Sequence, residues 1–227
     1  MGDSLRIMAI SAHPADFCSR SGGTLIKHIR AGAQVRVIWL SHGETDESKL
    51  LFDQNPDISL DEVRRVRAQE AMDCVQVMGA EGRMLGFGDN PLRMTPARIE
   101  ALAAEVQAFA PQVVLTHWRD ELTYPTHWIA ADAALKAVRH VKGTNDIRFF
   151  EPNIGTAARV GFQPDHYVDI GDVFEHKVEA LRTLAAQPHL VEMYTTCNRW
   201  RGIEAGCRYA EAFVRHAPRV AVQQLLL

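Results

Sequence analysis

Two side chains that can bind a metal ion lie in a polar turn near the start of the chain. His13 and Asp16 come directly after the apolar run 7–10, which is typical of a buried strand. An imidazole and a carboxylate belong to the common ligand sets of catalytic zinc and non-haem iron. Their spacing also fits a simple hydrogen bond within a loop. The choice between a metal site and a loop contact therefore depends on whether the chain offers further ligands.

Such candidates follow later apolar runs of the chain. We expect strands at 34–40, 112–116 and 147–150, each ending in a polar loop. These loops contain the possible ligands His42, Glu44, Asp46, Glu47, His117, His127 and Glu151. Open α/β sheets build their sites at the carboxyl ends of strands, so two histidines and a carboxylate can meet there.

The elements that must position these residues begin with a βαβ unit. A strand at 5–10, a helix at 24–30 and a strand at 34–40 fit its length and order. We expect Gly22 and Gly23 at the N-terminus of the helix, where they would let the backbone approach a ligand.

Further elements alternate in the same way. Helices are predicted at 59–78, 96–109, 128–141 and 173–186, strands at 83–87 and 166–170, a helix at 188–200, and a strand or helix at 208–214. In the helix after Ser59, which has the spacing of a capping box, the polar residues Arg64, Arg65, Arg67, Gln69 and Glu70 are expected to face solvent. The pattern predicts an α/β fold: a Rossmann-like, mostly parallel sheet flanked by helices, with the metal site at the carboxyl ends of the strands.

Length and charge limit the remaining possibilities. The 227 residues and net charge of −3 favour a single α/β domain over 1-227, whose C-terminal third (about 160-227) covers the core and the site. The charge gives no reason to expect nucleic acid or an anionic membrane as a partner. The apolar runs are too short to span a bilayer, and residues 1–6 lack the apolar core of a signal peptide. Four scattered cysteines favour reduced thiols and a cytoplasmic location.

Two motifs resemble those of a known family. His13-Pro-Ala-Asp16, followed by Gly22-Gly-Thr-Leu25, is similar to the signature of the PIG-L/LmbE metal-dependent de-N-acetylases. The resemblance continues at Gly43-Glu44, in the loop from Thr116 to His127 and in a late pattern that ends at Gln187. It implies a divalent metal, with zinc as the default, held by His13, Asp16 and His127. It also implies a small-molecule substrate and a homo-oligomer.

The chain departs from this family at positions that matter for hydrolysis. The family's general base is an Asp at the position of Ala15, its following Glu is replaced by Phe17, and an oxyanion-stabilising His corresponds to Tyr124. A general base contributes roughly 10²–10⁴ in rate. The resemblance therefore implies a retained metal site with impaired amide hydrolysis.

One branch of the family shares these departures. The PIG-L-type 4-oxalomesaconate hydratases of aromatic-acid breakdown resemble the chain at His-x-Ala-Asp-Phe, at Arg20, and at Gly43-Glu-x-x-Glu-Ser48. They also resemble it at Gly88-Asp-x-Pro-x-Arg93 and Phe150-Glu-Pro152, although Asn153 replaces a His of that branch.

Three hypotheses follow from these residues. In the first, the protein is a metal-dependent hydratase (lyase) for an unsaturated polycarboxylate oxo acid, in which Arg20, Arg93 and Tyr124 bind the substrate. Glu47 then helps water to add, with Glu44 as the second candidate or as a group that orients a ligand histidine. In the second, the protein is a de-N-acetylase in which Glu44 or Glu47 replaces the missing base. In the third, it is a non-catalytic metal-binding protein, against which the intact ligand set argues.

Overall fold

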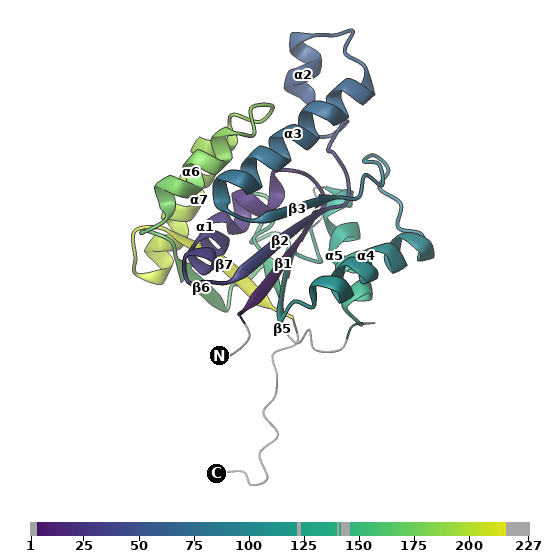
Figure 1. The fold of residues 1–227 in the computed structure, drawn as a ribbon. Helices are drawn as coiled ribbons and strands as arrows, with labels where there is room; N and C mark the ends of the chain where they lie inside the picture. Colours follow the sequence, from purple (N-terminus) through teal and green to yellow (C-terminus); the bar gives the residue numbers. More distant parts are fainter. Residues whose placement is uncertain (1–3, 122–123, 140, 142–145, 217–227) are drawn as a thin grey trace.

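The seven strands form one sheet, and most of them are parallel. The computed structural model describes residues 4–121, 124–139, 141 and 146–216. Its strands are β1 (Arg6–Ser11), β2 (Gln34–Trp39), β3 (Glu81–Met84), β4 (Val113–Thr116), β5 (Asp146–Phe150), β6 (His166–Asp169) and β7 (Ala210–Arg215). Their order is β3-β2-β1-β4-β5-β7-β6, and β7 runs opposite to the other six described strands (Figure 1). The predicted fold class is confirmed.

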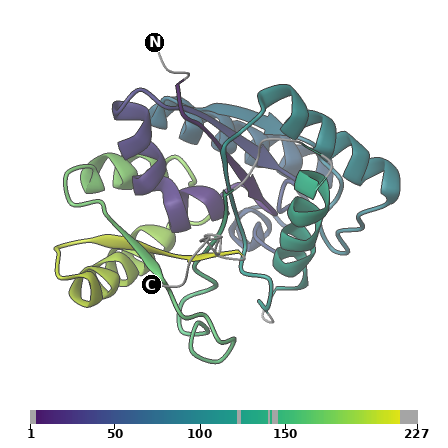
Figure 2. The same ribbon diagram turned by 90° about the horizontal axis from the view of Figure 1, so that it is seen from below.

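Helices cover both faces of this sheet. They are α1 (Asp16–Arg30), α2 (Lys49–Gln54), α3 (Leu60–Met78), α4 (Pro96–Phe109), α5 (Pro125–Arg139), α6 (Phe174–Arg182) and α7 (Leu190–Ala205). Helices α1, α3, α6 and α7 lie on one face, and α4 and α5 lie on the other (Figures 1 and 2). None of the helices in the described ranges is long and apolar enough to cross a membrane.

The central strand β1 is apolar from Ile7 to Ile10 because both of its faces are buried there. Ile7 and Ala9 pack under the layer of α1 and α3, whereas Met8 and Ile10 pack under α4 and α5. Side chains of a strand alternate between faces, so a continuous apolar run fits a strand in the middle of a three-layer fold. Both core layers reach the turn that contains His13. Ala12 belongs to the layer under α4 and α5, and Ala15 belongs to the layer under α1 and α3, so both ends of the turn are anchored.

Helix α1 differs from its prediction. It begins at Asp16 and not at residue 24, so Gly22 and Gly23 lie inside the helix. A Cβ atom on Gly23 would come within 2.8 Å of the Ile170 side chain, and one on Gly22 within 3.5 Å of Lys177. The glycines therefore allow the C-terminal third to pack closely against α1, and this packing outweighs their helix penalty of about 1 kcal/mol. The expected role in approaching a ligand was wrong.

A buried ionic contact fixes the C-terminal third to α1. The Lys177 ammonium group donates hydrogen bonds to the Ser19 carbonyl at 2.7 Å, to Asn198 at 2.6 Å and to Glu211 at 2.7 Å. The Glu211 carboxylate also accepts from the backbone N–H groups of Gly23 and Thr24. All three donors of the buried ammonium are thus used, which offsets the cost of burying the charge.

Smaller differences from the predictions concern the ends of some elements and the residues of α3 that were expected to face solvent. Strand β3 begins at Glu81, two residues before the predicted run, and α2 was not predicted. Ser59 caps α3 as expected, because its side chain accepts from the N–H of Glu62. The expected exposure of Arg67 and Glu70 was wrong, since both side chains are buried against the C-terminal third.

Candidate metal centre

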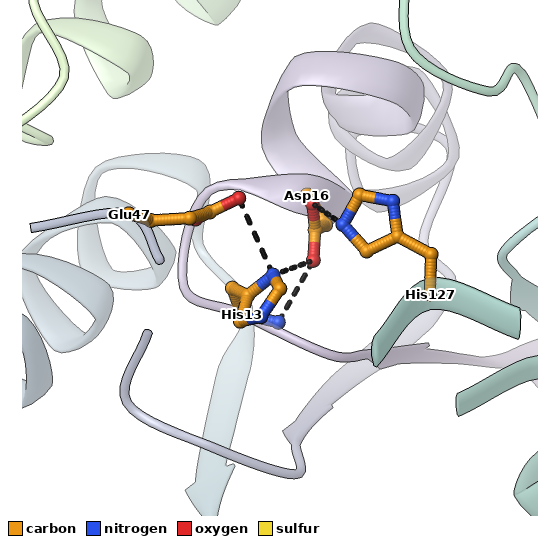
Figure 3. A group of neighbouring side chains, drawn as sticks. All are labelled: His13, Asp16, Glu47 and His127. Carbon is orange, nitrogen blue, oxygen red and sulfur yellow. Dashed lines mark hydrogen bonds and ion pairs between the residues drawn. The ribbon is translucent and has the colours of Figure 1, made fainter. Parts of the chain in front are cut away.

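Four ligand-type side chains meet at the carboxyl edge of the sheet. His13 follows β1, Asp16 begins α1, Glu47 comes from the loop after β2, and His127 lies in the first turn of α5 (Figure 3). One ligand atom from each side chain lies within 4.8 Å of the others. Sequence reasoning selected all four residues, and the structure brings them together.

The donor atoms of this cluster face one another. His13 Nδ1 lies 3.3 Å from Glu47 Oε1 and 3.4 Å from Asp16 Oδ2, and His127 Nε2 lies 3.4 Å from Asp16 Oδ1 (Figure 3). Both nitrogens are buried, and neither has a hydrogen-bond partner among the described residues. Buried polar atoms without partners are costly, and a metal ion would satisfy both. The donor set therefore fits the divalent metal that the family motif implies.

The charges of the cluster also favour a cation. Burial alone would lower the pKa of His13, but the neighbouring carboxylates, Glu47 first, raise it well above its ordinary value. Burial alone would raise the pKa of Asp16, but the His127 and His117 imidazoles and Arg20 hold it well below its ordinary value. The site thus stabilises positive charge next to ionised carboxylates.

Asp89 orients His13 from the outer side. Its Oδ1 lies 3.0 Å from His13 Nε2, and its Oδ2 accepts from the Thr45 hydroxyl and from the backbone N–H groups of Thr45 and Asp46. Burial alone would raise the pKa of Asp89, but the bonds from His13 and these backbone groups lower it. An ionised Asp89 places the His13 proton on Nε2 and leaves Nδ1 as a metal-facing lone pair. Glu44 was predicted as a candidate for this role, but Asp89 holds the position.

Arg20 supports Asp16 from one turn further along α1. Its Nη1 donates to Asp16 Oδ1 at 2.6 Å, and its Nη2 donates to the Asn153 side chain. Burial alone would lower the pKa of Arg20, but Tyr194 and the Asp16 carboxylate raise it, so the guanidinium stays charged. The Nε atom of Arg20 has no hydrogen-bond partner among the described residues.

His117 lies against the cluster without joining it. Its Nε2 accepts from the backbone N–H of Ala12 at 3.0 Å, and its ring stacks on His127 with centroids 4.2 Å apart. Burial is the main cause that lowers the pKa of His117 to about 3, so the ring is neutral. The neutral His117 ring is thus held by the backbone and packs against the His127 ring.

Other predicted residues lie outside the cluster. Glu44 is buried, and its Oε1 pairs with Arg64 Nε at 3.0 Å. Arg93 is exposed and is not among the residues that line the pocket beside the cluster. Glu151 forms a buried ion pair with Arg201 at 2.5 Å. The structure therefore gives no support to Glu44 or Arg93 as groups that act on the substrate, or to Glu151 as a metal ligand.

A pocket of about 300 Å³ opens beside the cluster. Its lining includes Ala15, Asp16, Arg20, Glu47, Tyr124, Asn153, Ile154, Gln187, His189, Leu190 and Tyr194. The Tyr124 ring stacks on His127 with centroids 5.1 Å apart, so it borders both the cluster and the pocket. Residues from the C-terminal third form one wall. A buried set of metal-ligand groups beside such a pocket defines a metal-dependent enzyme that acts on a small molecule.

Comparison with known proteins identifies the family. Residues 8–138 match the model described as PIG-L: GlcNAc-PI de-N-acetylase, and the chain belongs to this family. The 4-oxalmesaconate hydratase of Pseudomonas putida is 30% identical over 209 residues, which cover 87% of this chain and 80% of the relative. The diacetylchitobiose deacetylase of Thermococcus kodakarensis is 27% identical over 236 residues, which cover 96% and 85%.

A solved structure extends the comparison to the whole fold. The crystal structure of GalB, the 4-carboxy-2-hydroxymuconate hydratase of Pseudomonas putida KT2440, superimposes with a TM-score of 0.89 at 27% identity. The match covers 97% of this chain and all of the other chain. The relatives named here are hydratases and a deacetylase, and this chain is an enzyme of the same family.

Proposed function

We propose that the enzyme is a metal-dependent hydratase that adds water to a small unsaturated oxo acid with several carboxylates. One observation carries the proposal: Ala15, at the position of the deacetylase base, lines the same pocket as the buried, charged Arg20. Position 15 therefore lacks the carboxylate of the deacetylases, whereas Arg20 offers a cation to a substrate carboxylate. The named hydratase relatives support an oxo acid of the 4-oxalomesaconate type, as in aromatic-acid catabolism.

Three sets of side chains would contact different parts of the substrate. Arg20 would bind a substrate carboxylate through donors not used by Asp16 and Asn153, because a guanidinium has five N–H groups. Tyr124, which borders both the cluster and the pocket, would orient the reacting end. The apolar side chains Ile154 and Leu190 in the same wall would exclude water from the remainder of the substrate.

Glu47 is the group we propose for proton transfer. Its Oε1 faces the cluster, and its Oε2 lies 3.5 Å from Arg67 Nη2. Burial alone would raise the pKa of Glu47, but the charge on His13 lowers it, so the carboxylate is ionised and can accept a proton. Glu47 Oε1 would take a proton from the incoming water, whose oxygen bonds to one carbon of the double bond, and would give that proton to the other carbon, so that one whole water molecule is added.

His13, Asp16 and His127 would hold the metal, and zinc is the metal we propose. When bound there, the metal supplies Lewis acidity toward the oxo acid group. Asp89 and Arg20 keep His13 and Asp16 aimed at the site.

De-N-acetylation of an N-acetyl sugar is the second candidate. It is favoured by the family match and by Glu47, a carboxylate that reaches the cluster and could replace the missing base. Under this alternative the substrate is neutral and acetate is released.

One assay separates the two reactions. The metal-loaded enzyme is incubated with 4-oxalomesaconate, followed by its ultraviolet absorbance, and with a panel of N-acetylglucosaminyl substrates, followed by acetate release. Chelator-sensitive loss of the conjugated chromophore without acetate release is expected. Acetate release without hydration would overturn the hydratase proposal, and no turnover with zinc, Fe(II), Mn(II) or Co(II) would favour a non-catalytic metal-binding protein.

We also propose that the whole chain forms one domain, that the enzyme works in the cytoplasm, and that it forms a homo-oligomer. The four cysteines are free thiols, which supports a reducing compartment. A single cooperative unfolding transition and a mass above 25.4 kDa in light scattering are the expected results.

A further inference from the structure

Gln187 lies in the turn between α6 and α7, at the wall of the pocket. It lines the pocket beside the cluster and also an adjoining hollow of about 300 Å³, in both cases together with Glu47 and Tyr124. Its backbone is fixed, because its N–H donates to the Leu184 carbonyl at 2.9 Å and its own carbonyl accepts from Leu190 at 3.1 Å. The backbone of Gln187 therefore holds its side chain at a defined position near Glu47.

Arg67 fixes the direction of the Gln187 amide. The fully buried guanidinium donates through Nη2 to Gln187 Oε1 at 2.6 Å, and through Nη1 to Glu70 Oε2 at 2.6 Å. Glu70 Oε1 in turn accepts from the Ala186 N–H at 2.8 Å. Because a guanidinium has only donors, the amide oxygen must face Arg67, and the NH2 group must point to the other side.

That NH2 group is left without a protein acceptor. No hydrogen bond from Gln187 Nε2 is found within the described ranges, and Nε2 is not among the buried polar atoms that lack a partner. It is therefore accessible at a residue that lines the pocket. An oriented amide with two free N–H donors suits the oxygen acceptors of a carboxylate.

The residue type at this position fits binding better than a purely structural role. A Glu would pair with the buried Arg67 more strongly than a Gln does, since one partner of the bond would then carry a charge. It would, however, place a third carboxylate around Arg67, next to Glu70 and Glu47. It would also present negative charge to the substrate.

We propose that Gln187 is a specificity-determining residue that donates its Nε2 hydrogen bonds to a substrate carboxylate other than the one bound by Arg20. The inference rests on the proposed function for the class of substrate. Arg67 acts as a positioning residue, because it reaches the substrate only through Gln187 and Glu47.

The test is Gln187→Glu, which keeps an oxygen acceptor for Arg67 and replaces the pocket-facing N–H donors with a negatively charged oxygen. Binding of propane-1,2,3-tricarboxylate, a saturated probe that cannot be hydrated, is measured by calorimetry on the metal-loaded enzyme. KM and kcat for hydration are measured in parallel. The lost hydrogen bond and the added negative charge predict probe affinity about 10- to 100-fold weaker and KM raised by a similar factor. We expect kcat within about threefold of the original value and, because Arg67 keeps its acceptor, a melting temperature that does not fall.

Gln107→Glu is the matched control. It makes the same chemical change on the exposed face of α4, outside this pocket, and is expected to leave probe binding unchanged. Equal probe affinity and KM in Gln187→Glu and the original enzyme would overturn the inference, as would an original enzyme that does not bind the probe. If the original enzyme binds the probe but hydrates nothing, while Gln187→Glu binds it weakly, the inference stands and the proposed hydration fails.

Discussion

Two regions meet at the pocket, and they are built differently. The metal-facing cluster contains titratable side chains whose donor atoms point at one another, and three of its buried imidazole nitrogens lack hydrogen-bond partners among the described residues. The wall from the C-terminal third contains Gln187, Leu190 and Tyr194, and the polar contacts of Gln187 are set by the backbone and by Arg67. Under the proposed function, reactivity resides in the cluster, whereas the wall selects the substrate. Substitutions in the two regions should affect different kinetic constants.

The largest effect is expected from Glu47→Gln. Loss of the proton-accepting carboxylate should lower kcat about 10²- to 10⁴-fold, because a general base contributes a factor of this size. KM should change little, since the pocket wall is intact. Steady-state kinetics on 4-oxalomesaconate measure both constants.

Glu44→Gln is the matched control for Glu47→Gln, because the two residues share a loop and Glu44 instead pairs with Arg64. It should keep kcat within about threefold of the original. A large loss of kcat in Glu44→Gln with none in Glu47→Gln would reverse the two assignments.

Asp89→Asn tests the cluster without removing a ligand-type residue. The amide can no longer fix the His13 proton on Nε2 by charge, so zinc affinity should fall about 10- to 100-fold. Competition with a chromophoric chelator measures this affinity directly, independent of activity. Zinc binding equal to that of the original protein would show that His13 is oriented without Asp89.

Arg20 lies where the two regions meet, so its substitution should affect binding. Arg20→Lys keeps the charge but cannot reach Asp16 and Asn153 with separate nitrogens, and KM for a polycarboxylate should rise about 10-fold or more. Arg93→Lys, the same change at an exposed position, should leave KM within about twofold. A higher KM in Arg93→Lys than in Arg20→Lys would restore the earlier prediction for Arg93.

The smallest effect on function is expected where the wall is attached to α1. In Gly23→Ala the new methyl would lie 2.8 Å from the Ile170 side chain, and such overpacking costs about 1–3 kcal/mol of unfolding free energy. Thermal denaturation should show a lower melting temperature, with kcat little changed. The double variant with Ile170→Ala should recover part of the close-contact cost, and additive losses would contradict the packing explanation.

Periodicity predicted most strands and the capped start of α3, and the family resemblance implied His13, Asp16 and His127 as metal ligands. Strands and caps depend on local pattern, which the sequence can indicate. Glu47 was placed before Glu44 for the addition of water, but both stayed open as a replacement base, because three residues of loop do not define which side chain faces His13.

Contacts between distant parts of the chain were harder to predict. Asp89 lies 76 residues from His13, so no local pattern relates the two side chains. Arg67 fits the polar pattern of a solvent-facing helix position, but the C-terminal third covers it. The paired glycines suggested a loop before α1, because helix propensity does not include the packing of Ile170 and Lys177.

The position of β7 has a consequence for the order in which the protein can assemble on the ribosome. β7 is the last described strand, but it lies between β5 and β6, and β6 has no other neighbour in the sheet among the described strands. Residues 166–169 can therefore pair in the sheet only after the residues of β7 have been synthesised. The same late strand supplies Glu211, which holds Lys177 and α1 together. A nascent chain can thus form its metal-ligand loops well before it can form the wall that selects the substrate.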